Sequence, residues 1–138
     1  MELLCDTNVA LDLLLRRDPY MASSVQFLNM CEAGDVKGYI SVNSIADLYY
    51  IVRRATSSKE SAYKAVETIL KILKPCTVKD EDAVVAMATR GIDFEDNMME
   101  ACAVRNNFDA IITRNAKHFG ELGMRIMSPE ELLDRYML

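Results

Sequence analysis

The sequence lacks several features that would assign it to common classes of protein. It has no tryptophan, no G-x-x-x-x-G-K-[ST] loop and no pair of cysteines in a C-x-x-C arrangement. The missing loop argues against an ordinary P-loop nucleotide hydrolase, and the missing cysteine pair argues against a zinc site. The single histidine, His118, has no serine or cysteine nucleophile in a matching pattern, so a catalytic triad is not expected. We expect His118 to be a surface residue near a helix end.

Long hydrophobic runs are also missing. No stretch of about 18 consecutive apolar residues occurs, so we expect no membrane-spanning segment and no membrane partner. Residues 3–15 are largely apolar, but Asp6 and Asp12 interrupt them. No basic segment precedes them, as it would in a secretory signal peptide. The four cysteines are scattered, and we interpret them as reduced core residues. Together these features predict a cytoplasmic protein.

The chain has no excess of positive charge. Its 16 lysines and arginines are outnumbered by 21 aspartates and glutamates, which gives a net charge of −5. This argues against a protein that coats nucleic acid through an overall positive field. It does not exclude a nuclease, because bound cations neutralise active-site carboxylates and basic groups can cluster locally. Three basic clusters are equally compatible with contacts to nucleic acid and with solvated helix ends. They are Arg16-Arg17, Arg53-Arg54 with Lys59, and Arg105 with Arg114 and Lys117.

Short apolar strands alternate with amphipathic helices along the chain. The 138 residues are about one domain in length, and the 51% hydrophobic content is enough for one core. This alternation predicts a mostly parallel sheet with helices on both faces. We therefore expect an α/β fold, a three-layer α/β/α sandwich, in a single domain spanning residues 1–138. Strands are expected at residues 2–5, 38–42, 76–78, 109–113 and 125–127. Helices are expected at residues 8–16, 19–32, 44–54, between 58 and 75, 80–89, 94–106 and from 129.

Polar side chains stand where the expected strands end or the helices begin. Asp6 follows the first strand, and Asp47 lies in the first turn of the helix after the second strand. Asp96 lies in the first turn of a later helix, with Asp93 just before it, and Asn115 follows the fourth strand. The carboxyl ends of parallel strands meet at one edge, so these side chains should converge there. Carboxylates are the ligands that Mg²⁺ and Mn²⁺ prefer, and such an ion can activate water and stabilise charge on a phosphate.

Each of these acids also has a purely structural explanation. Residues 44–47 and 93–96 match capping boxes, which spacing alone favours over metal binding at those two places. Asp6 could cap the first helix, although a carboxylate that closes an apolar strand is costly to bury unless it is paired or metal-bound. Asn8 could hydrogen-bond a neighbouring ligand or cap the first helix. The recurrence of polar residues at matching ends of several units favours the metal site.

Four segments of the chain resemble motifs of the PIN-domain family. The similarity covers essentially the whole chain in order, spacing and length. It implies a PIN-like α/β/α fold and a Mg²⁺- or Mn²⁺-dependent endoribonuclease that hydrolyses RNA phosphodiesters. Many small members are toxins of VapC type, neutralised by an antitoxin protein and often homodimeric. The segments are Asp6-Thr7-Asn8, Ser44 to Asp47, Asp93-Phe94-Glu95-Asp96 with Ala101-Cys102-Ala103, and Ile111 to Asn115 with His118-Phe119.

The resemblance also implies roles for individual residues. The three metal ligands would be Asp6, Asp47 and Asp96, with Asp93 as an accessory acid. Thr113 and Asn115 would occupy the fourth position of the catalytic set and orient water or a ligand. The candidates for contacting RNA are Arg114, Lys117 and Asn8.

Two positions depart from the family pattern. The second acid is usually glutamate and is Asp47 here, and the fourth position is often aspartate and is Asn115 here. These departures motivate an alternative, a catalytically degenerate PIN-like module that binds RNA or a protein partner. A phospho-acceptor receiver domain also uses an acidic Mg²⁺ site on an α/β sandwich. It requires paired acids after the first strand and an acceptor aspartate after a central one, and the sequence shows neither clearly.

Overall fold

A five-stranded parallel sheet forms the centre of the molecule. The computed structural model describes residues 1–136. The strand order is β3-β2-β1-β4-β5, and every neighbouring pair is parallel. The chain therefore builds outward from β1 in one direction and then returns to add β4 on its other side. The strands are β1 (Glu2–Cys5), β2 (Lys37–Ser41), β3 (Lys74–Cys76), β4 (Ala110–Ile112) and β5 (Ile126–Met127).

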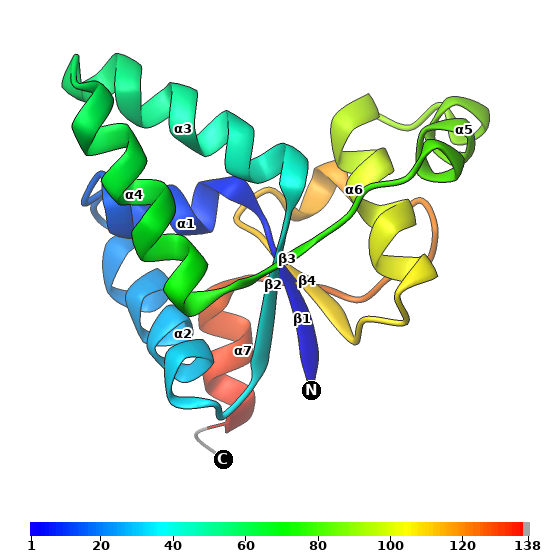
Figure 1. Cartoon of the computed structure of the whole chain (residues 1–138). Helices are drawn as coiled ribbons and strands as arrows, with labels where there is room; N and C mark the ends of the chain where they lie inside the picture. The colour runs from blue at the N-terminus through cyan, green and yellow to red at the C-terminus, as the bar shows by residue number, and fades with distance from the viewer. Residues whose placement is uncertain (137–138) are drawn as a thin grey trace.

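Helices cover both faces of this sheet (Figure 1). In that view α1 to α4 and α7 lie to the left of the strands, and α5 and α6 lie to the right. The predicted three-layer α/β/α architecture is confirmed. None of the described helices is both long and apolar enough to cross a lipid bilayer. The helices are α1 (Thr7–Leu14), α2 (Met21–Ala33), α3 (Val42–Thr56), α4 (Lys59–Ile72), α5 (Asp80–Thr89), α6 (Phe94–Arg105) and α7 (Pro129–Tyr136), with a short 3₁₀ helix η1 (Ala116–His118).

The central strand supplies side chains to two separate hydrophobic clusters. Leu3 and Cys5 pack into the larger cluster, which includes residues of α1, α2, α3, α4 and α7. Leu4 points to the opposite face and packs against Met99 of α6 and Phe108. Successive side chains of a strand face opposite sides of its sheet, so a short apolar strand with helices on both sides is buried along its length. This burial fixes β1, and the residue that follows it, in the middle of the molecule.

The boundaries of α3 and β3 are among those that differ from the sequence-based expectation. Helix α3 begins at Val42, because the hydroxyl of Ser41 accepts a hydrogen bond from the Ser44 amide at 3.1 Å and caps the helix there. The prediction that Ser44 caps this helix is wrong, and Asp47 lies in the second turn rather than the first. Strand β3 includes Pro75, which was expected to precede the strand. A proline lacks a ladder donor and is tolerated here because β3 is an edge strand.

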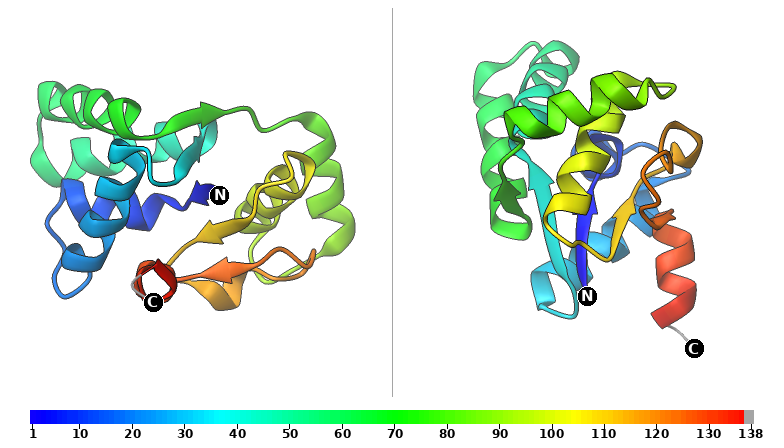
Figure 2. Two further views of the ribbon diagram at one scale, coloured as in Figure 1. Left: turned by 90° about the horizontal axis from the view of Figure 1, so that it is seen from below. Right: turned by 90° about the vertical axis from the view of Figure 1, so that its right-hand side faces the viewer.

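The sequence predicted the C-terminal end of α2 better than its N-terminal end. The helix begins at Met21 rather than near Pro19. At its other end Gly34 adopts the left-handed conformation with φ of 86°, and its amide bonds back to the last turn. Glycine adopts this conformation without the steric cost that a Cβ atom imposes, so the predicted stop after Ala33 is confirmed. Figure 2 shows α2 and α7 on the same side of the sheet from two further directions.

Candidate active site and metal centre

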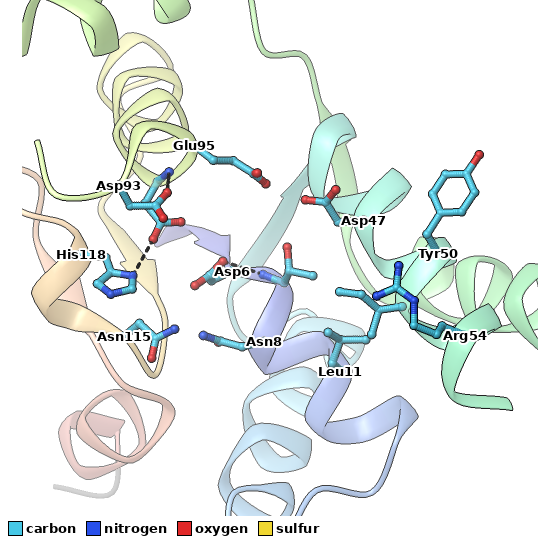
Figure 3. A pocket seen from close by; sticks show the side chains of 13 residues that line it. Asp6, Asn8, Leu11, Asp47, Tyr50, Arg54, Asp93, Glu95, Asn115 and His118 are labelled. Carbon is cyan, nitrogen blue, oxygen red and sulfur yellow. Dashed lines mark hydrogen bonds and ion pairs between the residues drawn. The ribbon is translucent and has the colours of Figure 1, made fainter. Parts of the chain in front are cut away.

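A cavity of about 470 Å³ opens at the carboxyl edge of the sheet. This edge lies where the strand order reverses around β1, the place where open α/β sheets bind ligands. Figure 3 shows the side chains that line the cavity, which come from α1, α3, α6 and the segment after β4. The structure thus brings together the polar residues that the sequence placed at one edge. Its acidic lining consists of Asp6, Asp47, Asp93, Glu95 and Asp96.

Asp6 stands at the centre of the edge, directly after β1. Its amide donates to the Ile112 carbonyl at 2.9 Å, which extends the pairing of β1 with β4. One carboxylate oxygen accepts from the Thr7 amide at 2.8 Å and the other from the Thr113 hydroxyl at 2.7 Å. The side chain therefore caps α1, yet it also lines the cavity. Burial raises the pKa of the Asp6 carboxyl, and the hydrogen bond from Thr113 opposes that rise.

Asp93, Asp96 and His118 form the tightest cluster in the cavity. One potential ligand atom from each lies within 4.8 Å of the other two. Asp93 caps α6 by accepting from the Asp96 amide at 2.9 Å, so the predicted capping role is confirmed. The Asp96 carboxylate is free of that cap and lies 3.1 Å from Nδ1 of His118. The expectation that His118 is a peripheral surface residue was wrong, because η1 folds it back against α6.

Crowding of acids perturbs the proton affinity of Asp96. Burial, together with the charges of Asp6 and Asp93, raises the pKa of its carboxyl to about 6. His118 opposes the rise through its hydrogen bond and its charge. Like charges held this close disfavour simultaneous ionisation. A cation bound among them would remove that penalty.

A second pair of acids faces the first across the cavity. Asp47 projects from the second turn of α3, and Glu95 projects from the first turn of α6 (Figure 3). The nearby Asp47 carboxylate is the main cause that raises the pKa of Glu95 to about 7, and burial and the charges of the other neighbouring acids add to it. Asp47 serves no helix cap, so the capping explanation given for it by spacing alone does not hold. Its proposed role as a metal ligand stays a prediction.

The segment after β4 positions Asp6 and adds Asn115 to the lining of the cavity. Thr113 is fully buried, donates to Asp6, and accepts from the Asn115 amide at 3.0 Å. Its hydroxyl therefore positions Asp6 and is not among the groups that line the cavity. Asn115 is exposed and does line it. Asn8 also lines it, and its side-chain oxygen accepts from the Arg114 amide at 3.4 Å.

The two cations predicted to contact RNA do not line the cavity, and their contact with RNA stays a prediction. Arg114 donates to both carboxylate oxygens of Asp12, at 2.8 and 2.9 Å, and its guanidinium lies 3.9 Å from the centre of the Tyr20 ring. Asp12 is fully buried and also accepts from the Ser24 hydroxyl at 2.8 Å. Arg114 is thus a structural residue that ties the end of β4 to α1 and α2. Lys117 is exposed on η1 and does not line the cavity.

A buried glutamate of α6, Glu100, holds the loop that follows η1. The Glu100 carboxylate of α6 is inaccessible to solvent and accepts from the backbone amides of Gly120, Leu122 and Met124 at 2.9 to 3.2 Å. Hydrogen bonds from backbone amides to a carboxylate are stronger than those between neutral groups. These bonds fix the loop that follows η1 against α6. They thereby help to hold His118 beside Asp96.

The set of side chains fits a small divalent cation. The cavity offers hard carboxylate oxygens, which Mg²⁺ and Mn²⁺ prefer, and one imidazole nitrogen. The potential ligand atoms of Asp93, Asp96 and His118 are already gathered, and Asp6 is held beside them by Thr113. Burial and repulsion between neighbouring acids raise the pKa values of Asp96 and Glu95, and a bound cation would relieve that repulsion.

The raised pKa values predict a pH dependence of stability in the metal-free protein. A carboxyl group with an ordinary pKa of about 4 in the unfolded chain holds its proton to higher pH when folded. Between pH 4 and about 7 the folded state therefore binds more protons at Asp96 and Glu95 than the unfolded state does. The free energy of unfolding should fall as pH rises through this window. Asp82 and Glu130 have lowered pKa values. Their contributions to the free energy of unfolding therefore change with pH mainly below this pH range.

Urea denaturation in EDTA at pH 5 and pH 7.5 measures this effect. We expect a lower midpoint at pH 7.5, a recovery when Mn²⁺ is added, and a smaller pH difference in Glu95→Gln. A midpoint that is unchanged or higher at pH 7.5 would show that the acids of the cavity are not in electrostatic conflict.

The site includes residues that sequence reasoning missed. The sequence motifs indicate no role for Glu95, and they place His118 at the surface. Tyr50, Ile51 and Arg54 also line the cavity, on the same helix as Asp47. Their spacing of three, four and seven residues from Asp47 is a signal that the sequence does contain. The approach of His118 to Asp96 has no such local signal, since it depends on how η1 folds back.

Comparison with known proteins gives one family and a consistent set of folds. The sequence matches the PIN domain over residues 2–117. No curated protein sequence matches the chain significantly. The fold is similar to that of VapBC2 from Rickettsia felis bound to a DNA fragment from its promoter, with 17% identity, a TM-score of 0.73, and coverage of 93% of this chain and 98% of that chain.

Two further solved structures show the same likeness. DNA-bound VapBC from Salmonella typhimurium has 16% identity and a TM-score of 0.72, with 94% of this chain and 98% of that chain covered. VapC20 from Mycobacterium tuberculosis, described as a toxin that cleaves the sarcin-ricin loop, has 12% identity and a TM-score of 0.68, with 88% and 95% covered. At these identities the likeness establishes the fold.

Proposed function

The chain belongs to the PIN-domain family, and we propose that it is a Mg²⁺- or Mn²⁺-dependent endoribonuclease. The observation that carries this proposal is the convergence of five carboxylates and one imidazole in a single cavity at the carboxyl edge of the sheet. The description of VapC20 as a toxin that cleaves the sarcin-ricin loop supports RNA as the substrate. The fit of the ligand set to a small divalent ion supports the metal requirement.

The residues of the cavity have distinct tasks in this proposal. Asp6, Asp96 and Asp47 would hold the ion, with Asp93 and His118 beside it. When bound, the ion lowers the pKa of an attacking water and stabilises negative charge on the phosphate oxygens. Thr113 keeps Asp6 oriented by donating to the oxygen that faces away from the Thr7 amide. Asn115 is placed to orient water or the RNA phosphate, since its side chain lines the cavity without a charge.

A cleavage assay tests the proposal directly. The purified protein is incubated with a labelled single-stranded RNA and a labelled RNA hairpin, with Mn²⁺, with Mg²⁺ and with EDTA. We expect internal cleavage that requires the metal, stops in EDTA and returns when metal is restored in excess. Cleavage that persists in EDTA would contradict the metal requirement.

Asn115 motivates the second candidate function, a degenerate module that binds RNA or a protein partner without cleaving. The amide removes one charge that many relatives carry at this position. The cavity nevertheless contains Glu95, a carboxylate beyond the four acids considered from the sequence. This carboxylate is an additional oxygen ligand in place of the one missing at Asn115, so the geometry favours the catalytic proposal. Metal binding by a protein that cleaves neither RNA would favour the degenerate module.

The position of His118 predicts which metal the site prefers. An imidazole nitrogen is a poorer ligand for Mg²⁺ than for transition metals, whereas carboxylate oxygens suit both Mg²⁺ and Mn²⁺. If His118 is a ligand, the affinity for Mn²⁺ should exceed that for Mg²⁺ by a wider margin in the native protein than in His118→Asp. Calorimetric titration of both ions into both proteins measures the two ratios, and we expect them to differ by about tenfold. Equal ratios would instead make His118 a residue that orients Asp96.

The same family likeness supports a role in a toxin–antitoxin pair. Several similar structures are VapBC complexes, two of them bound to DNA. We extend this to the present chain: it is a toxin that is neutralised by an antitoxin protein and forms a homodimer. Growth arrest on expression, relieved by co-expression of a small protein encoded beside it, would support this extension. Sedimentation measurements on the purified protein report the oligomeric state.

A further inference from the structure

The lining of the cavity continues beyond the carboxylates along α3. After Asp47, the residues Tyr50, Ile51 and Arg54 of this helix line it, and Leu11 of α1 lines it beside them. The spacing of these α3 residues places them on one face of the helix. Figure 3 shows Tyr50 and Arg54 beyond Asp47, on the side away from Asp93 and His118. We call Tyr50, Ile51 and Arg54 the α3 wall.

Arg54 differs from the other cations near the site. Among the described residues that line the cavity it is the only arginine or lysine. Its side chain is exposed, and within residues 1–136 no carboxylate lies within salt-bridge distance of it. The preceding Arg53 instead donates to the Tyr49 hydroxyl at 3.3 Å and does not line the cavity. Two adjacent exposed arginines therefore point to different surroundings, and one of them is directed to the site.

Tyr50 adds an aromatic surface to the same wall. It is 61% exposed although it borders the cavity, and its ring meets Tyr49 edge to face with centroids 5.0 Å apart. The contact with Tyr49 supports the ring while leaving much of it accessible. Exposed aromatic rings beside a cation are the combination that proteins use to bind single-stranded nucleic acid, because the ring stacks on a base and the cation contacts the backbone.

We propose that the α3 wall binds the RNA strand next to the bond that is cleaved, with Arg54 contacting a backbone phosphate and Tyr50 stacking on a base. This inference rests on the proposed ribonuclease function. An acid-lined cavity repels a polyanion, so a cation at its margin is needed to hold the strand beyond the phosphate at the metal. Arg54 lies seven residues, or about 10 Å along the helix axis, from Asp47. That separation suits a neighbouring nucleotide.

The two adjacent arginines give a matched pair of variants. We expect Arg54→Gln to raise KM for a single-stranded RNA about tenfold with kcat within about twofold, because it removes ground-state and transition-state binding alike. Its dependence of log affinity on log salt concentration should flatten by about 0.7, the value for one phosphate contact with a single strand. Arg53→Gln should leave KM, kcat and the salt dependence unchanged. Mn²⁺ binding, followed by calorimetry, should be the same in both variants and the native protein.

A tyrosine pair tests the stacking contact. Tyr50→Ala should raise KM by about tenfold, and Tyr136→Ala, which alters an exposed tyrosine of α7 outside the cavity, should not. If the native protein cleaves RNA and Arg54→Gln behaves as Arg53→Gln does, the assignment of the α3 wall is overturned while the ribonuclease function stands. If the native protein binds Mn²⁺ but neither binds nor cleaves RNA, both are overturned.

Discussion

Replacing Asp6 or Asp96 with asparagine is expected to slow RNA cleavage by roughly a thousandfold. Both side chains line the cavity, burial raises the pKa of both carboxyls, and at Asp96 the charges of neighbouring acids add to the rise. Loss of the metal removes several kcal/mol of stabilisation of the transition state, and each 1.4 kcal/mol changes the rate about tenfold. Initial rates at saturating Mn²⁺ measure the effect.

The fold should survive both replacements. An asparagine is close in size to aspartate, and a neutral amide avoids the cost of burying a charge, which raises the pKa of both carboxyls. At Asp6 the Thr113 hydroxyl can accept a hydrogen bond from the amide as readily as it donates to the carboxylate. Asp35→Asn, at an exposed position outside the cavity, is the matched control and should cleave at the native rate. Native rates in both Asp6→Asn and Asp96→Asn would exclude this cavity as the catalytic site.

The largest expected effect on stability comes from Asp12→Ala. The Asp12 carboxylate is fully buried between the Arg114 guanidinium and the Ser24 hydroxyl. Its removal leaves Arg114, which is 18% exposed, without its partner. Breaking a buried ion pair from one side costs about 3–5 kcal/mol, because the remaining charge loses its compensation. Urea denaturation should show a loss of this size in the free energy of unfolding.

A double-mutant cycle separates the pair from its surroundings. In Asp12→Ala/Arg114→Ala no charge is left unpaired, so the double variant should lose less free energy than the sum of the single variants. Arg114 follows Thr113, which orients Asp6, so the single variants should also weaken Mn²⁺ binding. Losses below about 1 kcal/mol that simply add would show that Arg114 does not tie the end of β4 to the helices.

Much of the site could be predicted because its residues stand where strands end or helices begin. Asp6, Asp93, Asp96 and Asn115 follow strands or begin helices, and a parallel sheet gathers such positions at one edge. Asp47 was assigned to the same edge, but with the wrong helical turn. Ser41 and Ser44 are both suitable caps, and only the extent of β2 decides that Ser41 begins the helix.

The remaining parts of the site depend on contacts between distant segments. His118 reaches Asp96 because Glu100 and the amides it binds hold the loop after η1 against α6. Arg114 was assigned to RNA from its charge and its place in the motif, whereas its partner Asp12 lies 102 residues earlier. Short-range patterns carry no information on such pairings. Glu95 lines the cavity because it precedes Asp96 in the first turn of α6. Its position could therefore have been predicted from the sequence.

Calorimetric titration of Mn²⁺ into the metal-free protein tests the central claim, that this edge of the sheet holds a divalent ion. The account predicts binding by the native protein that disappears in Asp6→Asn/Asp96→Asn, with both proteins showing the same folded circular-dichroism spectrum. Equal binding by the native protein and the double variant would place the metal elsewhere. No binding by the native protein, either alone or with RNA present to supply further ligands, would contradict the account.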